Sequence, residues 1–447
     1  MSLFRFLIVI FLLALAGCNS EPASDDANND LQNQDQLEQD KDNADDPETP
    51  INSDDQVTTI TDVYDYLNEL RNSAGMISVA KNELLALAAK NHTDYLVSHN
   101  SFGHDQIEGL SGFTGFSASD RANEVLYFSR NVGEGIAAGK NANNAIDNLF
   151  SAIYHRFTLL HPDFNEIGIS AKVKTDSPSM ILVHNIANSE LNRLCQEAPS
   201  TGSGIHFTNV CSDDTRLAAT EYNQTLMNTR SLNEELIVWP PVDGKNIPPV
   251  FFEETPDPLP DYSVSGYPVS VQYNSTSADE FILNAIYLYE DATNERVTST
   301  RLLNGDTDPN QSFSDNQYAL FPLQRLSWDT QYRVEISYSI NGISGSKNWT
   351  FQTQMPAKDV IEIKQNQTNF NLSNGVKTAV YIPPNNPFDT LQSVNVTSPE
   401  GVHVEMEIFD GNTLLINASS ATGGAITITL NDGIDFVPRV FTVEIST

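Results

Sequence analysis

The spacing of hydrophobic residues changes near Leu236, and this change limits the folds that the chain can adopt. Before about Cys211, apolar residues recur three, four and seven positions apart, as in residues 63–70, which indicates amphipathic helices. Beyond Leu236, apolar and polar residues alternate, as in residues 332–338, which indicates strands with one buried face. The helical pattern does not suit a strand, and the alternating pattern does not suit a helix. The sequence therefore predicts a helix-containing part followed by an all-β part.

The helix-containing part also includes two strand-like runs, at residues 167–173 and 180–186. Three apolar stripes predict three helices. We expect the residues of the second stripe to be buried; they are Leu84, Leu87, Ala88 and Tyr95. Helices mixed with a few strands predict an α/β or α+β sandwich.

The all-β part has the pattern of sandwich domains. One strand of strict alternation ends at Asn341-Gly342, a dipeptide typical of tight hairpin turns. The run from Leu326 to Val334, which contains Tyr332, resembles the tyrosine-corner strand of fibronectin-III and bacterial immunoglobulin-like modules. Further alternating runs near the C-terminus predict a second β-sandwich that carries no chemical motif.

The N-terminal residues differ from the predicted domains in composition. Residues 1–17 contain Arg5 and an apolar run too short to span a membrane, so we interpret them as a secretory signal peptide. They lead into Cys18 in a sequence that resembles a bacterial lipobox, in which the cysteine carries the lipid. An ordinary cleaved signal is the alternative. Residues 18–55 are acidic and nearly free of apolar side chains, which predicts an extended, disordered tether. We expect a lipid-anchored protein of the cell envelope, in the outer membrane.

Charge and cysteine content exclude several classes of protein. The chain has 24 Lys and Arg against 59 Asp and Glu, a formal net charge of −35. This argues against nucleic acid as a partner, because such binding needs clustered basic residues. Three cysteines are too few for a disulfide-dense scaffold or a four-cysteine metal site. With Cys18 lipidated, Cys195 and Cys211 remain, and outside the cytoplasm such a pair predicts one disulfide.

The positions of the histidines confine metal or near-neutral acid–base chemistry to the helix-containing part. Seven of the eight histidines lie between His92 and His206, and the eighth, His403, lies in an alternating strand. His92 and His99 share the second predicted helix, where we expect both to be partly exposed.

A series of short motifs runs in order through the helix-containing part. The motifs are 67–71 (LNELR), 102–104 (FGH), 120–121 (DR), 132–139 (VGEGIAAG) and 154–168 (YHRFTLLHPDFNEIG). Together they resemble the bacterial form of the CAP superfamily, which includes cysteine-rich secretory proteins, antigen 5 and pathogenesis-related 1 proteins. Each motif alone is weak, and the ordered set covers under a third of the chain.

The resemblance implies an α-β-α sandwich with a large surface cleft, where the family often places two histidines and two glutamates. The matching residues here are His104, His155 and Glu134. The second glutamate has no clear match, and Asp147 is only a loose candidate for its place. Gly135 stands beside Glu134 where the family usually has asparagine. The expected set of four residues is therefore incomplete.

The candidate residues suit more than one kind of chemistry. Two neutral imidazoles, from His104 and His155, can hold zinc or another divalent cation with water in the open positions. Glu134 would then ligate the metal or orient a histidine. Without metal, histidine and glutamate could perform acid–base catalysis. They could also form a purely structural network, so no catalytic role is assigned firmly to any of the three.

The expected fold is an α-β-α sandwich followed by two all-β immunoglobulin-like sandwiches. In order, the expected segments are a signal peptide (1–17), a tether (18–55), a CAP domain (56–215), a Pro-rich connector (216–261), an immunoglobulin- or fibronectin-III-like β-sandwich (262–355) and a C-terminal β-sandwich (356–447). We expect a surface-displayed lipoprotein whose cleft binds a small ligand, peptide, lipid, glycan or divalent cation, with the β-sandwiches as stalk or adhesion surfaces. The alternatives are a metal-dependent hydrolase, such as a protease or cell-wall enzyme, and a structural envelope protein.

Overall fold

The computed structural model of the protein describes residues 60–174, 179–197, 203–252, 254–276, 279–432 and 439–446. The expected signal peptide (1–17), lipidated Cys18 and tether (18–55) lie outside the described residues. Within the described ranges, no helix combines the length and the apolar character needed to cross a bilayer.

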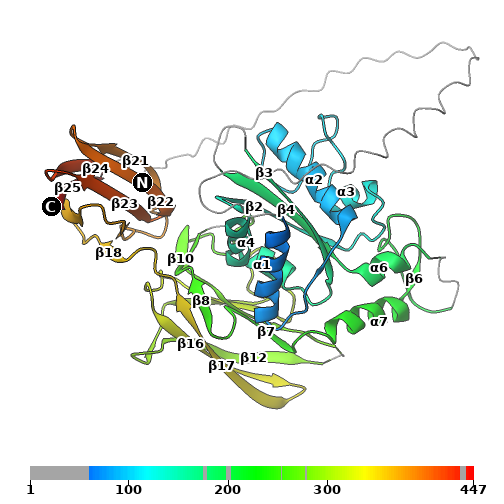
Figure 1. Cartoon of the computed structure of the whole chain (residues 1–447). Helices are drawn as coiled ribbons and strands as arrows, with labels where there is room; N and C mark the ends of the chain where they lie inside the picture. The colour runs from blue at the N-terminus through cyan, green and yellow to red at the C-terminus, as the bar shows by residue number, and fades with distance from the viewer. Residues whose placement is uncertain are drawn as a thin grey trace, which may run out of the picture. The chain divides into compact units, whose positions relative to one another are not determined.

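A four-stranded sheet with helices on both faces forms the first folded part (Figure 1). Its elements are α1 (Ile60–Ser73), β1 (Ala80–Lys81), α2 (Glu83–Ser98), α3 (Ala118–Glu124), β2 (Val132–Gly139), α4 (Ala142–Ser151), α5 (Ile153–Leu159), β3 (Glu166–Val173) and β4 (Met180–Ala187). The strand order is β1-β3-β4-β2, so β2 lies at an edge. Helix α2 packs on the face that carries Ile181 and Val183, whereas α1 and α4 pack on the face that carries Leu182. Neighbouring residues of a strand point to opposite faces, and the result is the α-β-α sandwich that the sequence predicts.

The buried face of α2 differs in part from the predicted one. Of the predicted stripe, Ala88 and Tyr95 are buried, at 0% and 3% exposure, as expected. Leu84 and Leu87 are 36% and 45% exposed, so the expectation that they are buried is wrong. The helix lies directly on Gly168 of β3, where an added Cβ would come within 1.9 Å of the backbone nitrogen of Ala86. This close approach fixes which face of α2 meets the sheet, and the apolar pattern alone does not reveal it.

A short extension follows the sheet and contains the disulfide. It consists of α6 (Ser189–Leu194), β5 (His206–Phe207), β6 (Leu217–Ala218) and α7 (Ala219–Arg230). Cys195 and Cys211 are joined, which confirms the predicted bridge. The Nη2 atom of Arg230 donates to Oδ2 of Asp163 at 3.0 Å and holds α7 against the loop before β3.

Two sheets form the first β-sandwich. Their strands are β7 (Leu236–Trp239), β8 (Gly244–Ile247), β11 (Val269–Tyr273), β12 (Phe281–Glu290), β13 (Glu295–Arg296), β14 (Thr300–Leu303), β15 (Gln317–Pro322), β16 (Gln331–Ile340) and β17 (Ile343–Thr353). The orders are β14-β15-β11-β7 and β13-β12-β16-β17-β8. The Tyr332 hydroxyl accepts the backbone N–H of Ser327 at 2.9 Å, which confirms the predicted tyrosine corner.

Residues 216–261, interpreted from sequence as a Pro-rich connector, contain ordered elements. They supply α7, β7, β8 and β9 (Val250–Phe252), and β9 pairs with β10 (Val264–Gly266). Strand β7 pairs with β11 and β8 pairs with β17, so part of this segment belongs to the first β-sandwich. The prolines border the strands instead of interrupting them: Pro240 follows β7, and Pro249 precedes β9.

The α-β-α sandwich and the first β-sandwich share one hydrophobic core. A continuous cluster joins side chains of α1 and α4 to those of β7, β11 and β16. At the junction, Phe150 packs on Trp239 with ring centroids 4.5 Å apart. Arg156 of α5, fully buried, donates to the carbonyl of Pro268 at 2.8 Å and to the hydroxyl of Ser270 at 3.2 Å. Two parts joined through a common core and buried hydrogen bonds are expected to unfold together.

The C-terminal β-sandwich has its own core. Its strands are β18 (Asp359–Glu362), β19 (Asn369–Ser373), β20 (Thr378–Tyr381), β21 (Leu391–Thr397), β22 (Val402–Asp410), β23 (Thr413–Ser420), β24 (Gly424–Asp432) and β25 (Arg439–Ser446). The sheet orders are β18-β20-β23-β22 and β19-β25-β24-β21, and the pairs β18–β20 and β19–β25 are parallel. A separate cluster of buried aliphatic and aromatic side chains fills the space between the sheets.

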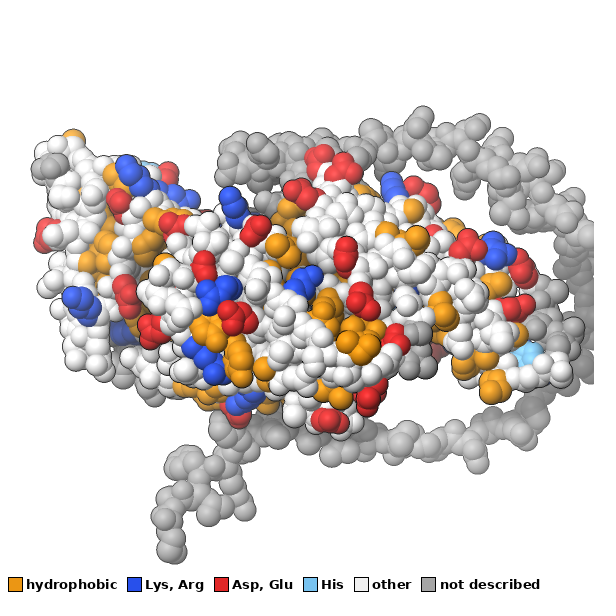
Figure 2. All heavy atoms as spheres, turned by 90° about the horizontal axis from the view of Figure 1, so that it is seen from below, with side chains coloured by type: hydrophobic (Ala, Val, Ile, Leu, Met, Phe, Trp, Pro, Cys, Tyr) orange, Lys and Arg blue, Asp and Glu red, His pale blue; other side chains and the backbone are white. Residues whose placement is uncertain are grey.

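Charged side chains of both signs are interspersed on the face of the molecule seen in Figure 2, with small apolar groups between them. Some of the surface charges pair, as in the 2.7 Å contact between Arg333 and Asp291. Exposed ion pairs contribute about 0–1 kcal/mol each, so the buried clusters rather than the surface charges stabilise the fold.

Replacing Phe150 tests the shared core. We expect Phe150→Ala to lower the free energy of unfolding by about 3–5 kcal/mol, the usual cost of removing a buried aromatic ring. Calorimetry should show one shifted transition for the α-β-α sandwich together with the first β-sandwich. As a control, Phe116→Ala removes an exposed ring and should change stability by less than about 0.5 kcal/mol. Two separate transitions, only one of them shifted, would contradict the shared core.

Candidate functional site

The two histidines singled out by sequence lie side by side. The rings of His104 and His155 are nearly parallel, at 18°, with centroids 5.9 Å apart. His104 belongs to the segment between α2 and α3, and His155 belongs to the first turn of α5. His104 is 47% exposed, whereas His155 is mostly buried. We call these two residues the histidine pair.

Glu134 of β2 lies behind His104. Its Oε1 atom contacts His104 Nδ1 at 2.9 Å, and Arg121 Nη2 donates to Oε1 at 2.8 Å and to Oε2 at 2.7 Å. Burial raises the pKa of Glu134, but the hydrogen bond from His104 and the charge of Arg121 outweigh it, so the pKa lies below its ordinary value. Glu134 is therefore an ionised carboxylate that orients His104.

The DR motif positions Arg121 for this contact. Ser117 and Asp120 form a capping box at the start of α3, in which the Ser117 backbone N–H donates to Asp120 Oδ2 at 3.0 Å. Arg121 follows directly, is fully buried, and also donates to the carbonyl of Phe116 at 2.9 Å. The cap fixes the first turn of α3, and the guanidinium then reaches Glu134.

A second carboxylate, Glu254, lies behind His155. Its Oε2 atom contacts His155 Nδ1 at 3.1 Å, and its Oε1 atom accepts the backbone N–H groups of Ile153 at 2.5 Å and Tyr154 at 3.3 Å. These N–H groups begin α5, where a helix favours negative charge. Sequence reasoning missed Glu254, because it lies in the segment interpreted as a connector. The only sequence signal that could have pointed to Glu254 is an acidic side chain just after the apolar strand β9. This signal is not specific for a functional site.

Asp147, the loose candidate for the second glutamate, does not fill that place. Its carboxylate accepts the hydroxyl of Tyr66 at 2.5 Å, and burial raises the pKa of Asp147 to about 6. The expectation for Asp147 is therefore corrected: the carboxylate that contacts His155 belongs to Glu254. Glu254 is held at this place because the N-terminus of α5 offers its carboxylate two backbone N–H donors in addition to the ring nitrogen of His155.

Gly135 stands beside Glu134 because a buried histidine occupies the space next to it. His184 of β4 lies opposite Gly135 in the sheet, and a Cβ at position 135 would come within 2.2 Å of His184 Nε2. His184 is fully buried, and neither of its ring nitrogens has a hydrogen-bond partner among the residues that the structure describes. Burial lowers the pKa of His184 to about 3, so its ring is neutral near pH 7.

His92 also lies at the site, with its Nε2 atom 4.0 Å from Glu134 Oε1. The expectation that His92 is partly exposed is wrong. His92 is fully buried; its Nε2 atom contacts the carbonyl oxygen of Gly103 at 3.1 Å, and its Nδ1 atom contacts the side-chain nitrogen of Gln106 at 3.1 Å. Burial lowers the pKa of His92 to about 4. His92 therefore fastens the segment that carries His104 to α2.

The arrangement provides two imidazoles, each held at Nδ1 by a buried carboxylate. Across the described ranges, no group of three or more His, Cys, Asp or Glu side chains is arranged to hold a metal ion. A cation at the histidine pair would thus have two protein ligands and complete its shell with water or a bound molecule.

A family model matches the part of the chain that contains the histidine pair. The model of the cysteine-rich secretory protein family, CAP, matches residues 64–186. This range runs from α1 to β4 and includes Glu134, so the α-β-α sandwich is a CAP domain. A search of curated proteins found no match to the chain.

Solved structures of bacterial proteins match parts of the chain. An outer surface protein of Borrelia burgdorferi is 20% identical, with a TM-score of 0.25, over 28% of this chain and 89% of that protein. An extracellular protein of Bacillus anthracis that contains an SCP domain is 22% identical, with a TM-score of 0.25, over 29% of this chain and 40% of that protein. Fibronectin(III)-like modules of Clostridium thermocellum are 11% identical, with a TM-score of 0.15, over 47% of this chain and 94% of that structure.

Substitution of Gly135 tests the packing of His184. We expect Gly135→Ala to lower the free energy of unfolding by about 1–3 kcal/mol, because the new methyl group would overlap the imidazole ring. Chemical denaturation measures the loss. Gly305→Ala serves as the control, because an added Cβ there meets its nearest atom at an ordinary 3.4 Å. Equal stability of Gly135→Ala and the native chain would rule out this packing.

The neutral state of His184 predicts a pH dependence of stability. Its folded pKa of about 3 lies below the unfolded value near 6.5, so the unfolded chain binds one more proton between these values. Stability should therefore fall as pH decreases through this window. In His184→Leu, the slope of unfolding free energy against pH between about pH 4.5 and 5.5 should decrease by about 1.4 kcal/mol per pH unit.

Urea denaturation across this pH range measures the slope. His403→Leu replaces an exposed histidine of β22 and should leave the slope unchanged. The interpretation of His184 as a buried neutral group fails if His184→Leu keeps the native slope.

Proposed function

We propose that the CAP domain formed by residues 64–186 binds a divalent cation such as zinc at the histidine pair, on an exported protein of the cell envelope. The observation that carries this proposal is the pairing of each imidazole with its own buried carboxylate. His104 contacts Glu134 at 2.9 Å, and His155 contacts Glu254 at 3.1 Å, in both cases through Nδ1.

This pairing prepares a histidine for metal binding. When Nδ1–H donates to a carboxylate, the neutral ring keeps its lone pair on Nε2, and the carboxylate makes that nitrogen a better ligand. Within the described part of the chain, no hydrogen bond involves Nε2 of either member of the histidine pair. Two imidazole ligands suit zinc at weak to moderate affinity.

Hydrolysis at the same site is the second candidate, and the exposure of His104 favours it. Its ring is 47% exposed and contacts the ionised Glu134. Such a histidine could accept a proton from a water molecule as a general base, with or without a metal. The other alternative is a structural network in which the same contacts only fix the loops around the site.

Export and anchoring are proposed from the sequence and the disulfide. The bridge between Cys195 and Cys211 suits an oxidising compartment. The signal peptide (1–17) and a lipid on Cys18 would supply export and attachment to the outer membrane. In this proposal the two β-sandwiches act as a stalk or as adhesion surfaces, and a small ligand, peptide, lipid or glycan could complete the shell of the cation.

Zinc calorimetry on the full chain without its signal peptide tests the proposal. We expect the native protein to bind zinc, with affinity falling as pH decreases through about 6.5 because protonated imidazole cannot ligate. His104→Ala combined with His155→Ala should abolish this binding. Glu254→Gln should weaken it about 10–100-fold, the usual effect of removing a carboxylate behind a metal-binding histidine.

The exposed His403 provides the matched control, because His403→Ala removes an imidazole of β22 that takes no part in the histidine pair. Its zinc binding should equal that of the native chain. An absence of zinc heat in the native protein, or unchanged binding in the double variant, would assign the histidine pair to a structural network. The metal-dependent form of the hydrolase alternative would then lose its main support as well.

A further inference from the structure

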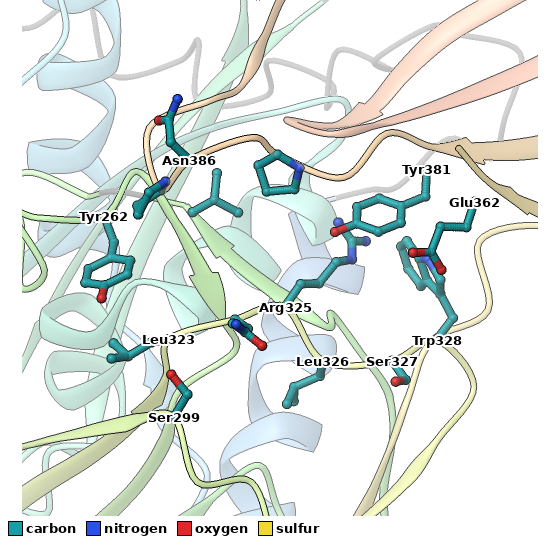
Figure 3. A pocket seen from close by; sticks show the side chains of 14 residues that line it. Tyr262, Ser299, Leu323, Arg325, Leu326, Ser327, Trp328, Glu362, Tyr381 and Asn386 are labelled. Carbon is teal, nitrogen blue, oxygen red and sulfur yellow. The ribbon is translucent and has the colours of Figure 1, made fainter. Parts of the chain in front are cut away.

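A pocket outside the CAP domain lies where loops of the two β-sandwiches meet. Residues 323–328 of the first β-sandwich line it, with Tyr262 and Asn386 on one side and Tyr381 on the other (Figure 3). Asn386 and Tyr381 belong to the C-terminal β-sandwich. Its volume is about 620 Å³, which lies in the usual range for small-molecule sites. None of its lining residues belongs to the histidine pair or its carboxylates, so this pocket is independent of the function proposed above.

Arg325 is a buried charged side chain with unused donors in this pocket. Its guanidinium lies between the rings of Trp328 and Tyr381, at 4.0 and 4.8 Å from their centroids, and its Nη2 atom donates to Asp410 at 2.7 Å. The side chain is only 6% exposed. Among the described residues, neither Nε nor Nη1 of Arg325 has a partner. A buried unpaired donor costs about 1–3 kcal/mol, so these two atoms favour a ligand that offers acceptors.

Trp328 adds a third unused donor and a flat surface. Its indole Nε1–H is buried without a partner in the described part of the chain, while the residue as a whole is partly exposed. Glu362 lies next to Trp328 and Tyr381 and brings acceptor oxygens to the same wall (Figure 3). The pocket therefore combines aromatic rings, at least three donors and a carboxylate.

This combination fits a sugar better than other ligands. A sugar ring has apolar C–H groups that pack on aromatic rings, and its hydroxyl groups both donate and accept. A lipid tail would leave the donors of Arg325 unpaired. A phosphate would meet the carboxylates of Glu362 and Asp410. A peptide has fewer hydroxyl groups than a sugar of the same size, so it would satisfy fewer of these donors and acceptors at once.

We infer that this pocket binds a short neutral saccharide. Arg325 and Trp328 donate to its oxygen atoms, Glu362 accepts from a hydroxyl group, and the parts of the aromatic rings that the guanidinium does not cover contact the sugar. Asp410 keeps the Arg325 guanidinium in place, and the remaining donors of the guanidinium bind the ligand.

Tryptophan fluorescence of the full chain without its signal peptide tests this inference. Trp239 and Trp349 are both 3% exposed in the core, so Trp328 reports on the pocket. Chitotriose, cellotriose and maltotriose are the probes. At least one of them should change the emission in a saturable manner, and Trp328→Phe should remove that change.

Variants then locate the binding, which calorimetry measures. Arg325→Lys keeps a positive charge beside Asp410 but removes the planar donor fork, so affinity should fall about ten-fold or more. Tyr381→Leu removes a ring of the pocket wall and should have a similar effect. Tyr287→Leu removes a ring of β12 outside the pocket and should leave affinity unchanged. Circular dichroism confirms that each variant is folded.

Three results would overturn the inference. One is the lack of any response to all three saccharides up to about 10 mM, the weak end of specific binding. Another is native affinity in both Arg325→Lys and Tyr381→Leu. The last is a response to triglycine without a response to the saccharides, which would assign the pocket to peptides.

Discussion

The buried guanidinium of Arg156 connects the α-β-α sandwich to the first β-sandwich, and the position of the histidine pair depends on this connection. It donates to the carbonyl oxygens of Phe150 at 2.6 Å and Pro268 at 2.8 Å and lies 5.0 Å from the ring centroid of Tyr267. A buried charge is tolerated only with such partners. Because Arg156 directly follows His155 in α5, the contacts that hold the guanidinium against the first β-sandwich also fix the imidazole beside Glu254.

Buried arginines have comparable roles elsewhere in the CAP domain. Arg71, Arg121 and Arg156 are among the largest fully buried side chains of the described residues. Arg71 donates to the carbonyls of Ile77 and Leu159, whereas Arg121 holds Glu134. Each guanidinium joins segments that lie apart in the sequence. The loops around the histidine pair are thus fixed by polar contacts inside the protein rather than by covalent bonds.

The sequence predicts those features that depend on local spacing or on ordered motifs. Helical and alternating periods indicate the three folded parts, and the motifs identify His104, His155 and Glu134. Glu254 could not be found in this way, because its contact with His155 exists only once the first β-sandwich docks against α5. The same limit applies to His184. Strand alternation predicts the face of the sheet on which its side chain lies, but not that Gly135 on the neighbouring strand leaves space for the ring.

The parallel pairing of β19 with β25 determines how the C-terminal β-sandwich would respond to a pulling force. β19 lies near the start of this domain, and β25 lies at its end. Tension applied through the preceding chain and through the C-terminus would slide these strands along each other. All of their hydrogen bonds would then carry load at the same time, whereas an antiparallel pair pulled from one end opens one bond after another. This geometry predicts that the β19–β25 pair resists tension better than an antiparallel pair of the same length would.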